Sequence, residues 1–202
     1  MSLWCIVPAA GLSRRFGPAD KLLAPFGSGR SPLVRYALAA AVAANSIDGV
    51  VLVVREGEAG EAVTAAVADL MALKPVLLVR VAEQGGGLGR SIAAGARAVP
   101  AAVSGAMVLP ADMPNVTPAW LEQLAGSFAE HGKASIIVPM TAAGEQRNPV
   151  IWPADLVAEL AALGGEPGGK GLIALYQERV VRVPASDEAL FRDIDVPADL
   201  DL

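Results

Sequence analysis

The sequence predicts an α/β fold in which a doubly wound, mostly parallel sheet lies between two layers of helices. Short segments rich in Val, Ile and Leu alternate with longer Ala-rich segments, which is the element order typical of this fold. Hydrophobic residues make up 53% of the chain, a composition that suits strands covered on both faces. The 202 residues are enough to bury a complete core, and we expect a single domain over residues 1–202.

The expected strands and helices alternate over the first two thirds of the chain. The segments predicted as strands are Leu3–Val7, Val50–Arg55, Val76–Val81, Ala106–Leu109 and Ser135–Val138. The segments predicted as helices are Pro32–Ala44, Glu58–Ala72, Ser91–Val99 and Pro118–Glu130. Proline is tolerated in the first turn of a helix, so Pro32 and Pro118 indicate two helix starts, and Thr117 is expected to cap the second.

The last third of the sequence has a less regular pattern. Its expected elements are a strand at Pro149–Trp152, a helix at Ala154–Leu163, a loop at Gly164–Gly171 and strands at Arg179–Val183 and Phe191–Asp195. No repeat, low-complexity linker or change in composition indicates a domain boundary. We therefore expect this part to shape a substrate pocket on the same domain.

Composition and charge argue against several classes of protein. The apolar runs are far shorter than the roughly 20 residues of a membrane-spanning helix, and no basic stretch precedes an apolar segment near the N-terminus. Cys5 is the only cysteine, which excludes an intrachain disulfide, and a cytoplasmic protein without membrane contact is predicted. The net charge of −5, with no basic run, argues against nucleic acid as a partner.

A loop rich in glycine and basic residues, PAAGLSRRFGPADKLLAPFG, follows the first expected strand. Its glycines and cations near the strand are Gly11, Arg14, Arg15, Gly17 and Lys21. Ligands of open α/β sheets bind beyond the carboxyl ends of the strands, and exposed amides together with Arg side chains can hold a phosphate. The spacing matches neither GxGxxG nor the P-loop. A flexible surface loop with solvated charges is the alternative.

Five segments occur in the order found in nucleotidyltransferases with the MobA-like fold. AAGLSRRFGPADKLL resembles the signature loop of that family, and GGGLGRSIAAG resembles its glycine-rich segment. VLPADMPNV, NPVIWP and DIDVPADL resemble three later motifs. The sequence is therefore identified as a member of this family, most similar to the branch of molybdenum cofactor cytidylyltransferases. The resemblance implies a Rossmann-like nucleotidyltransferase fold.

The resemblance also implies phosphate-binding roles for residues of the loop. Lys21 would contact the α-phosphate of a nucleoside triphosphate and the attacking group, and Arg15 would contact the β- and γ-phosphates. Backbone or hydroxyl donors to the phosphates would come from Gly11, Leu12 and Ser13. Binding of a polyanionic nucleotide by these groups would explain why an acidic chain concentrates positive charge in one loop.

A second set of residues is expected to bind the base. Backbone groups of Ala9 and Ala10 lie where a base edge could be recognised, and in the family Ala-Ala-Gly at this point goes with cytidylyl or adenylyl transfer. Ala10 therefore favours CTP. Gly85, Gly86 and Ser91 would complete the base pocket, and Ser91 could equally cap the helix that follows it.

Two aspartates at the ends of expected strands are candidate ligands of Mg²⁺. Asp112 follows an apolar strand, and Asp195 ends the last expected strand with Asp193 on the same side. Mg²⁺ usually takes one or two carboxylates together with substrate phosphates and water. The resemblance implies that Asp112 and Asp195 hold the ion together and that Asp112 is catalytic, whereas for Asp193 we expect a structural or supporting role. Capping of a turn or a helix is the alternative role for both.

The predicted function is Mg²⁺-dependent transfer of CMP from CTP to molybdopterin or a related phosphorylated acceptor, with release of pyrophosphate. The alternatives are transfer to a sugar or polyol phosphate and a non-catalytic nucleotide-binding protein. Three positions depart from the family on the acceptor side: Asn148 replaces a histidine, Glu166 an aspartate, and Lys170 falls near an arginine. The acceptor is therefore left open.

Overall fold

The computed structural model describes residues 2–13, 15–17, 19–82, 87–165 and 168–201. Within these residues seven strands form one sheet in the order β5-β4-β1-β6-β8-β7-β9. The strands are β1 (Leu3–Ala9), β4 (Gly49–Arg55), β5 (Val76–Val81), β6 (Gly105–Val108), β7 (Ile136–Met140), β8 (Val150–Pro153) and β9 (Val180–Pro184). Only β8 runs against its neighbours β6 and β7 among these pairings, so the sheet is mostly parallel, as predicted.

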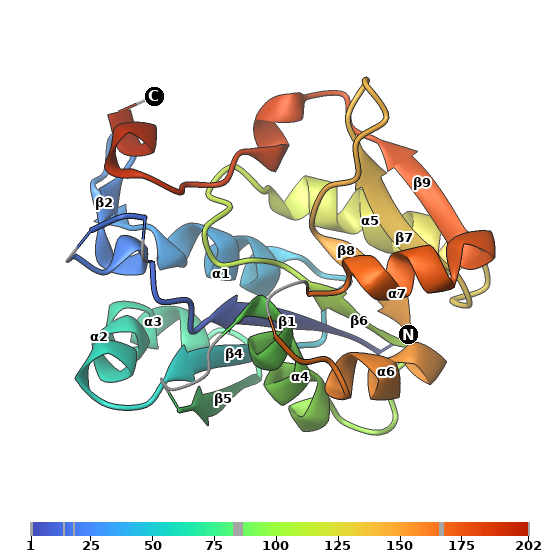
Figure 1. The fold of residues 1–202 in the computed structure, drawn as a ribbon, viewed down its shortest axis with the longest axis horizontal. Helices are drawn as coiled ribbons and strands as arrows, with labels where there is room; N and C mark the ends of the chain where they lie inside the picture. Colours follow the sequence, from blue (N-terminus) through green and yellow to red (C-terminus); the bar gives the residue numbers. More distant parts are fainter. Residues whose placement is uncertain (1, 14, 18, 83–86, 166–167, 202) are drawn as a thin grey trace.

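Helices cover both faces of the sheet, which gives the predicted three layers (Figure 1). One face packs against α1 (Val34–Ala43), α2 (Glu58–Ala66) and α5 (Pro118–Glu130). The other packs against α4 (Leu88–Ala98), α6 (Val157–Ala161) and α7 (Lys170–Leu175). Side chains of β1 alternate between the two cores, because successive residues of a strand point to opposite faces. No helix among the described residues is long and apolar enough to cross a membrane.

Shorter elements connect these layers. They are η1 (Lys21–Leu23), β2 (Pro25–Phe26), β3 (Ser31–Pro32), α3 (Ala68–Met71), η2 (Ala154–Leu156), η3 (Gln177–Arg179), η4 (Glu188–Phe191) and η5 (Pro197–Asp201). Several lie where the sequence predicted something longer or different. The helix expected over 58–72 is interrupted at Val67, whose φ of −125° and ψ of 10° separate α2 from α3. The loop expected over 164–171 ends early, because α7 begins at Lys170.

The two proline-based predictions of helix starts had different outcomes. α5 begins at Pro118, and its first-turn Trp120 amide donates to the Thr117 hydroxyl at 3.2 Å, which confirms the expected cap. Pro32 instead lies in β3, paired with Pro25 of β2, and α1 begins two residues later. A proline has a φ that suits either a helix start or an edge strand, so the residue alone does not separate the two.

The strand expected at 191–195 is wrong. After η4 this segment is irregular, and the Ile194 amide donates to the Asp112 carbonyl at 3.1 Å. Asp112 lies beyond the end of β6, so the passing segment meets a loop rather than a free strand edge. The Asp199 carboxylate then accepts from the Asp195 and Val196 amides at 2.7 and 2.9 Å. In Figure 1 this last part of the chain, in red, returns from the side of β9 to the side of β2.

Candidate functional site

The loop after β1 places Lys21 at the carboxyl end of the sheet. Lys21 is the first residue of η1, and the Asp20 carboxylate accepts from the Leu22 amide at 2.9 Å. Leu22 is buried in the core on the α1 face. The short helix is therefore held at one end by a cap and on one side by apolar packing, which fixes where the Lys21 side chain starts.

Lys21 lies within an ion-pair cluster with two aspartates that are distant in sequence. Its Nζ is 2.6 Å from Asp112 Oδ2 and 3.6 Å from Asp195 Oδ1. Arg15 NH1 is 3.0 Å from Asp195 Oδ2. The Lys21 side chain is only 11% exposed, whereas that of Arg15 is 75% exposed at the rim. The structure thus brings together all four side chains predicted for catalysis and metal binding. Arg14 lies outside the described residues.

Asp193 adds a third carboxylate to this cluster. Burial raises the pKa of Asp193, and the negative charges of Asp195 and Asp112 raise it further. Sequence reasoning gave Asp193 only a supporting role, but the residue lines both cavities described below. The described part of the cluster contains these three carboxylates and two cations, Arg15 and Lys21, so acidic groups are in excess.

Two adjoining cavities meet at this cluster. The first, which we call the Lys21 cavity, has a volume of about 440 Å³ and is lined by Pro8, Gly11, Leu12, Ser13, Arg15, Lys21 and Ser91, among others. The second, the Trp152 cavity, has a volume of about 460 Å³ and is lined by Val150, Trp152, Leu160, Lys170 and Ile173, among others. Both are lined by Leu88, Pro110, Asp112, Asn148 and Asp193. Asp112 therefore stands where two bound molecules could meet.

The residues predicted to bind phosphate and base are only partly brought to the Lys21 cavity. Gly11, Leu12 and Ser13 line it. Ala9 and Ala10 are 3% and 7% exposed, and their side chains pack into the two cores instead. The predicted contacts of their backbone groups with a base remain a prediction. Gly85 and Gly86 lie outside the described residues.

Ser91 is not a helix cap. α4 begins at Leu88, so Ser91 is its fourth residue. The Ser91 hydroxyl donates to the Gly87 carbonyl at 3.5 Å. The helix therefore starts three residues earlier than predicted. Ser91 is nearly buried, at 6% exposure, and lines the Lys21 cavity. Of the two roles considered for this residue, the cap is therefore wrong.

Gly11 leaves open space beside the Lys21 cavity. A Cβ added at Gly11 would meet no atom within 4 Å, so no protein neighbour requires glycine there. Its φ is not positive; the loop instead takes positive φ at Ser13 (49°) and Gly17 (95°). Because Gly11 lines the cavity, its missing side chain allows close approach of a bound molecule to the backbone.

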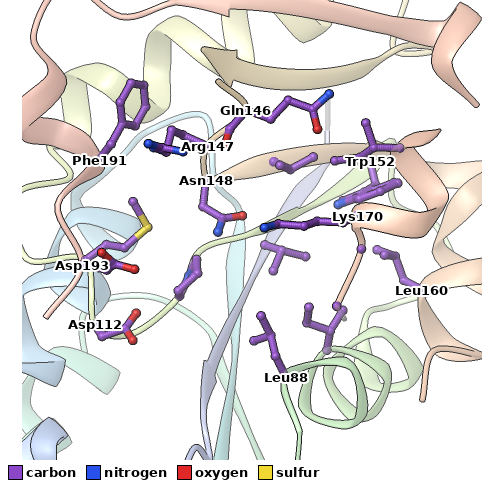
Figure 2. Close-up of a pocket in the computed structure, with 18 residues that line it drawn as sticks. Leu88, Asp112, Gln146, Arg147, Asn148, Trp152, Leu160, Lys170, Phe191 and Asp193 are labelled. Carbon is purple, nitrogen blue, oxygen red and sulfur yellow. Dashed lines mark hydrogen bonds between the residues drawn. The ribbon is translucent and has the colours of Figure 1, made fainter. Parts of the chain in front are cut away.

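The Trp152 cavity combines apolar walls with polar groups at one side. Figure 2 shows the Lys170 amine and the Asn148 amide pointing into the cavity, with Asp112 and Asp193 across from them. Lys170 has no ion-pair partner among the residues that the structure describes, whereas Arg147 pairs with Glu145. Lys170 and Asn148 were two of the three departures noted on the acceptor side; Glu166 lies outside the described residues.

The donor set at the cluster fits a divalent cation that arrives with a phosphorylated ligand. Among the described residues no group of three His, Cys, Asp or Glu side chains is arranged to hold a metal ion alone. Mg²⁺, however, is usually bound by one or two carboxylates together with phosphates and water. Asp112 and Asp195, which both contact Lys21, supply two hard oxygen ligands of this kind.

Comparisons with known proteins identify the family of the chain and its fold. A family model described as a MobA-like NTP transferase domain matches residues 5–182. No curated protein sequence matches the chain. Among solved structures, the chain is similar to the homologue of Mycobacterium tuberculosis Rv0371c from Mycobacterium sp. strain JC1. That pair has 25% identity and a TM-score of 0.77, with 98% of this chain and 93% of that chain covered.

Two further structures share the fold at lower identity. Rv0371c from Mycobacterium tuberculosis H37Rv, solved in complex with manganese, is 24% identical with a TM-score of 0.68, covering 100% of this chain and 92% of that chain. The 4-diphosphocytidyl-2C-methyl-D-erythritol synthase of Anaerococcus prevotii DSM 20548 is 14% identical with a TM-score of 0.71, covering 98% of this chain and 92% of that chain. These likenesses show the nucleotidyltransferase fold predicted from the sequence.

Proposed function

The chain belongs to the MobA-like NTP transferase family, and we propose that it transfers CMP from CTP to a phosphorylated small-molecule acceptor with release of pyrophosphate. One observation carries the proposal. Lys21, Asp112 and Asp195 form one cluster at the meeting point of two cavities, so a nucleotide and an acceptor can approach each other beside Lys21.

The Lys21 cavity is the proposed nucleotide site. Lys21 would contact the α-phosphate and the attacking oxygen, because its ammonium lies beside Asp112, which lines both cavities. Arg15, exposed at the rim, would contact the β- and γ-phosphates. Both cations are paired with carboxylates here, so nucleotide binding requires them to exchange carboxylate partners for phosphate oxygens. The amides of Gly11 and Leu12 and the Ser13 hydroxyl supply further donors.

The reaction needs alignment and charge neutralisation rather than a covalent intermediate with the protein. An oxygen of the acceptor phosphate forms a bond to the α-phosphorus of CTP, while the bond from that phosphorus to the bridging oxygen breaks and pyrophosphate leaves. Lys21 faces the reacting phosphate and holds it in line with the acceptor, which is the main contribution that a site of this kind makes. Its positive charge also stabilises the charge on the phosphate oxygens.

The proposed cofactor is Mg²⁺, held by Asp112 and Asp195. The acidic excess among the described residues of the cluster supports a cation, since their three carboxylates would otherwise repel a polyanionic nucleotide. When bound, the ion would offset the negative charge of the phosphates during transfer. The manganese complex of Rv0371c, a protein of the same fold, also supports a divalent cation.

The choice of CTP is supported by Ala10 and by one structural relative. In the family, Ala-Ala-Gly at this point goes with cytidylyl or adenylyl transfer, and this chain has Ala9-Ala10-Gly11. The Anaerococcus prevotii protein is named for a diphosphocytidyl product.

For the acceptor we propose molybdopterin or a related flat, phosphorylated compound. The apolar walls of the Trp152 cavity, which include Trp152, Leu160 and Ile173, suit a flat ring system. Lys170, unpaired among the described side chains, suits the anionic group of such a ring. A polyol phosphate is the second candidate, favoured by the methyl-D-erythritol in the name of the Anaerococcus prevotii synthase. A polyol phosphate bound in the Trp152 cavity would need hydrogen-bond partners for its many hydroxyl groups.

The test is thermal unfolding of the purified protein with CTP, GTP, ATP and UTP, each with and without Mg²⁺. We expect stabilisation by CTP that depends on Mg²⁺, followed by release of pyrophosphate with one acceptor of a phosphorylated panel. Stabilisation by GTP would contradict the base assignment of Ala10. Binding of CTP without pyrophosphate release from any acceptor would favour a non-catalytic nucleotide-binding protein.

A further inference from the structure

We propose that Asp20 and Arg55 form a positioning pair that sets where the Lys21 ammonium lies. Asp20 precedes Lys21 in the loop after β1, and Arg55 is the last residue of the neighbouring strand β4. Arg55 NH2 donates to Asp20 Oδ2. This inference rests on the proposed function, because it assigns the pair a role in nucleotide binding through Lys21.

Asp20 uses its two carboxylate oxygens for two different contacts. Oδ1 accepts from the Leu22 amide at 2.9 Å and so caps η1, while Oδ2 accepts from Arg55. One side chain thus joins the helix that begins with Lys21 to the rigid strand beside it. These two contacts act together with the packing of Leu22 to hold η1 against β4.

Arg55 is anchored from the side of the sheet. Its backbone pairs with Val81 of β5, and the next amide, that of Glu56, donates to the Val81 carbonyl at 2.9 Å. The first turn of α2 also packs tightly on this strand end, since a Cβ at Gly60 would lie 1.7 Å from the Arg55 carbonyl oxygen. The guanidinium therefore extends from a fixed backbone into the loop.

Charge gives the pair a second effect on Lys21. Asp20 is the carboxylate adjacent to Lys21 in sequence, yet Lys21 pairs with Asp112 and Asp195. Arg55 neutralises Asp20, so this carboxylate does not compete for the ammonium. The side chains of Asp20 and Arg55 are each 12% exposed. Ion pairs this buried add little net stability, so positioning explains the arrangement better than stability does.

The test measures CTP affinity in the presence of Mg²⁺ by calorimetry for Asp20→Asn, Arg55→Gln and Arg55→Lys. The Asp20→Asn side chain keeps an oxygen acceptor for the Leu22 amide, but it replaces the charged oxygen that accepts from Arg55 with an NH2 donor. Arg55→Lys keeps a cation and is the conservative rescue. Each is made in the wild-type chain and in Lys21→Ala, and urea unfolding of every variant without nucleotide reports stability. Asp69→Asn, which breaks the Arg35–Asp69 ion pair on the surface, is the matched control.

With Lys21 present, Asp20→Asn and Arg55→Gln are expected to weaken CTP binding about tenfold, the scale of one charge-assisted hydrogen bond. Arg55→Lys recovers most of the affinity, and Asp69→Asn leaves it unchanged. In the Lys21→Ala background the same substitutions change the affinity less than about twofold, because sites that act through one another are not additive.

Three results would each overturn the inference while leaving the proposed function intact. They are equal losses in both backgrounds, Arg55→Lys binding as weakly as Arg55→Gln, and unchanged affinity in Asp20→Asn and Arg55→Gln. If the wild-type chain binds no nucleoside triphosphate, the proposed function fails first, and the inference falls with it.

Discussion

Asp112→Asn separates the metal role of Asp112 from its ion pair with Lys21. The contact of 2.6 Å joins side chains that are 11% and 26% exposed, and a charge-assisted hydrogen bond so placed contributes about 1–2 kcal/mol. Loss of the Asp112 charge also relieves repulsion from Asp193, whose pKa it helps to raise. The free energy of unfolding without ligand should therefore fall by no more than about 1 kcal/mol.

The effect on ligand binding should be larger. With Mg²⁺ and CTP at about 100 times the wild-type Kd, binding stabilises the native wild-type protein by about 2.7 kcal/mol. For a chain of 202 residues this raises Tm by about 5–10 °C. Losing one of two carboxylate ligands should weaken binding at least about 100-fold, since even partners of metal ligands cost 10–100-fold. The gain in the variant then falls to about 0.4 kcal/mol, a shift of less than about 2 °C.

The assay is thermal and urea unfolding of both proteins with and without Mg²⁺ and CTP. The control is Asp155→Asn, which breaks the ion pair between Asp155 and Arg179 away from the cluster. This variant should show the same increase in Tm with Mg²⁺ and CTP as the wild type. An Asp112→Asn variant that is stabilised by Mg²⁺ and CTP as much as the wild type would refute the metal assignment of Asp112.

Three further predictions concern single side chains. Lys21→Ala should lose about 2–4 kcal/mol of transition-state stabilisation, measured as the fall in kcat/KM. A change confined to KM would show instead that Lys21 binds the ground state and the transition state equally. Burial raises the pKa of the Cys5 thiol to about 12, so thiol reagents at pH 8 should label the unfolded chain and spare the native one, and rapid native labelling would contradict this. Thr117→Ala should lower the free energy of unfolding by about 1 kcal/mol in urea, with Thr117→Ser restoring it; equal stability of all three would argue against the cap.

Most of the fold could be predicted because its signals are local. β1 is apolar throughout, and β4 is apolar up to its last residue, Arg55. Thr117 followed by proline is a cap signal that needs no tertiary information. The expected strand at 191–195 failed for the opposite reason. Its pattern suits a strand, but a strand needs a free edge to pair with, and only the tertiary structure shows that Ile194 meets a loop at Asp112.

The same distinction applies to the site. Ligands bind at the carboxyl ends of parallel strands, and both the loop after β1 and Asp112 after β6 lie at such ends. The sequence was therefore sufficient to assign them to the site. The contact between Lys21 and Asp112 spans 91 positions, and the sequence did not predict it, because the resemblance implied a phosphate role for Lys21 and a metal role for Asp112. Arg55 had no such signal, since a cation at the end of an apolar strand is ordinary. Asp193 lines both cavities because of the path of an irregular segment, and local sequence patterns do not predict such a path.

The most direct measurement is a crystal structure of the protein with Mn²⁺ and a non-hydrolysable CTP analogue, using the anomalous signal of the metal. We predict an anomalous peak within coordination distance of Asp112 and Asp195, with the Lys21 ammonium on the α-phosphate and Arg15 on the outer phosphates. A nucleotide bound elsewhere, or bound while Lys21 and Arg15 remain paired with these aspartates and no metal lies between them, would contradict the proposed function of the cluster.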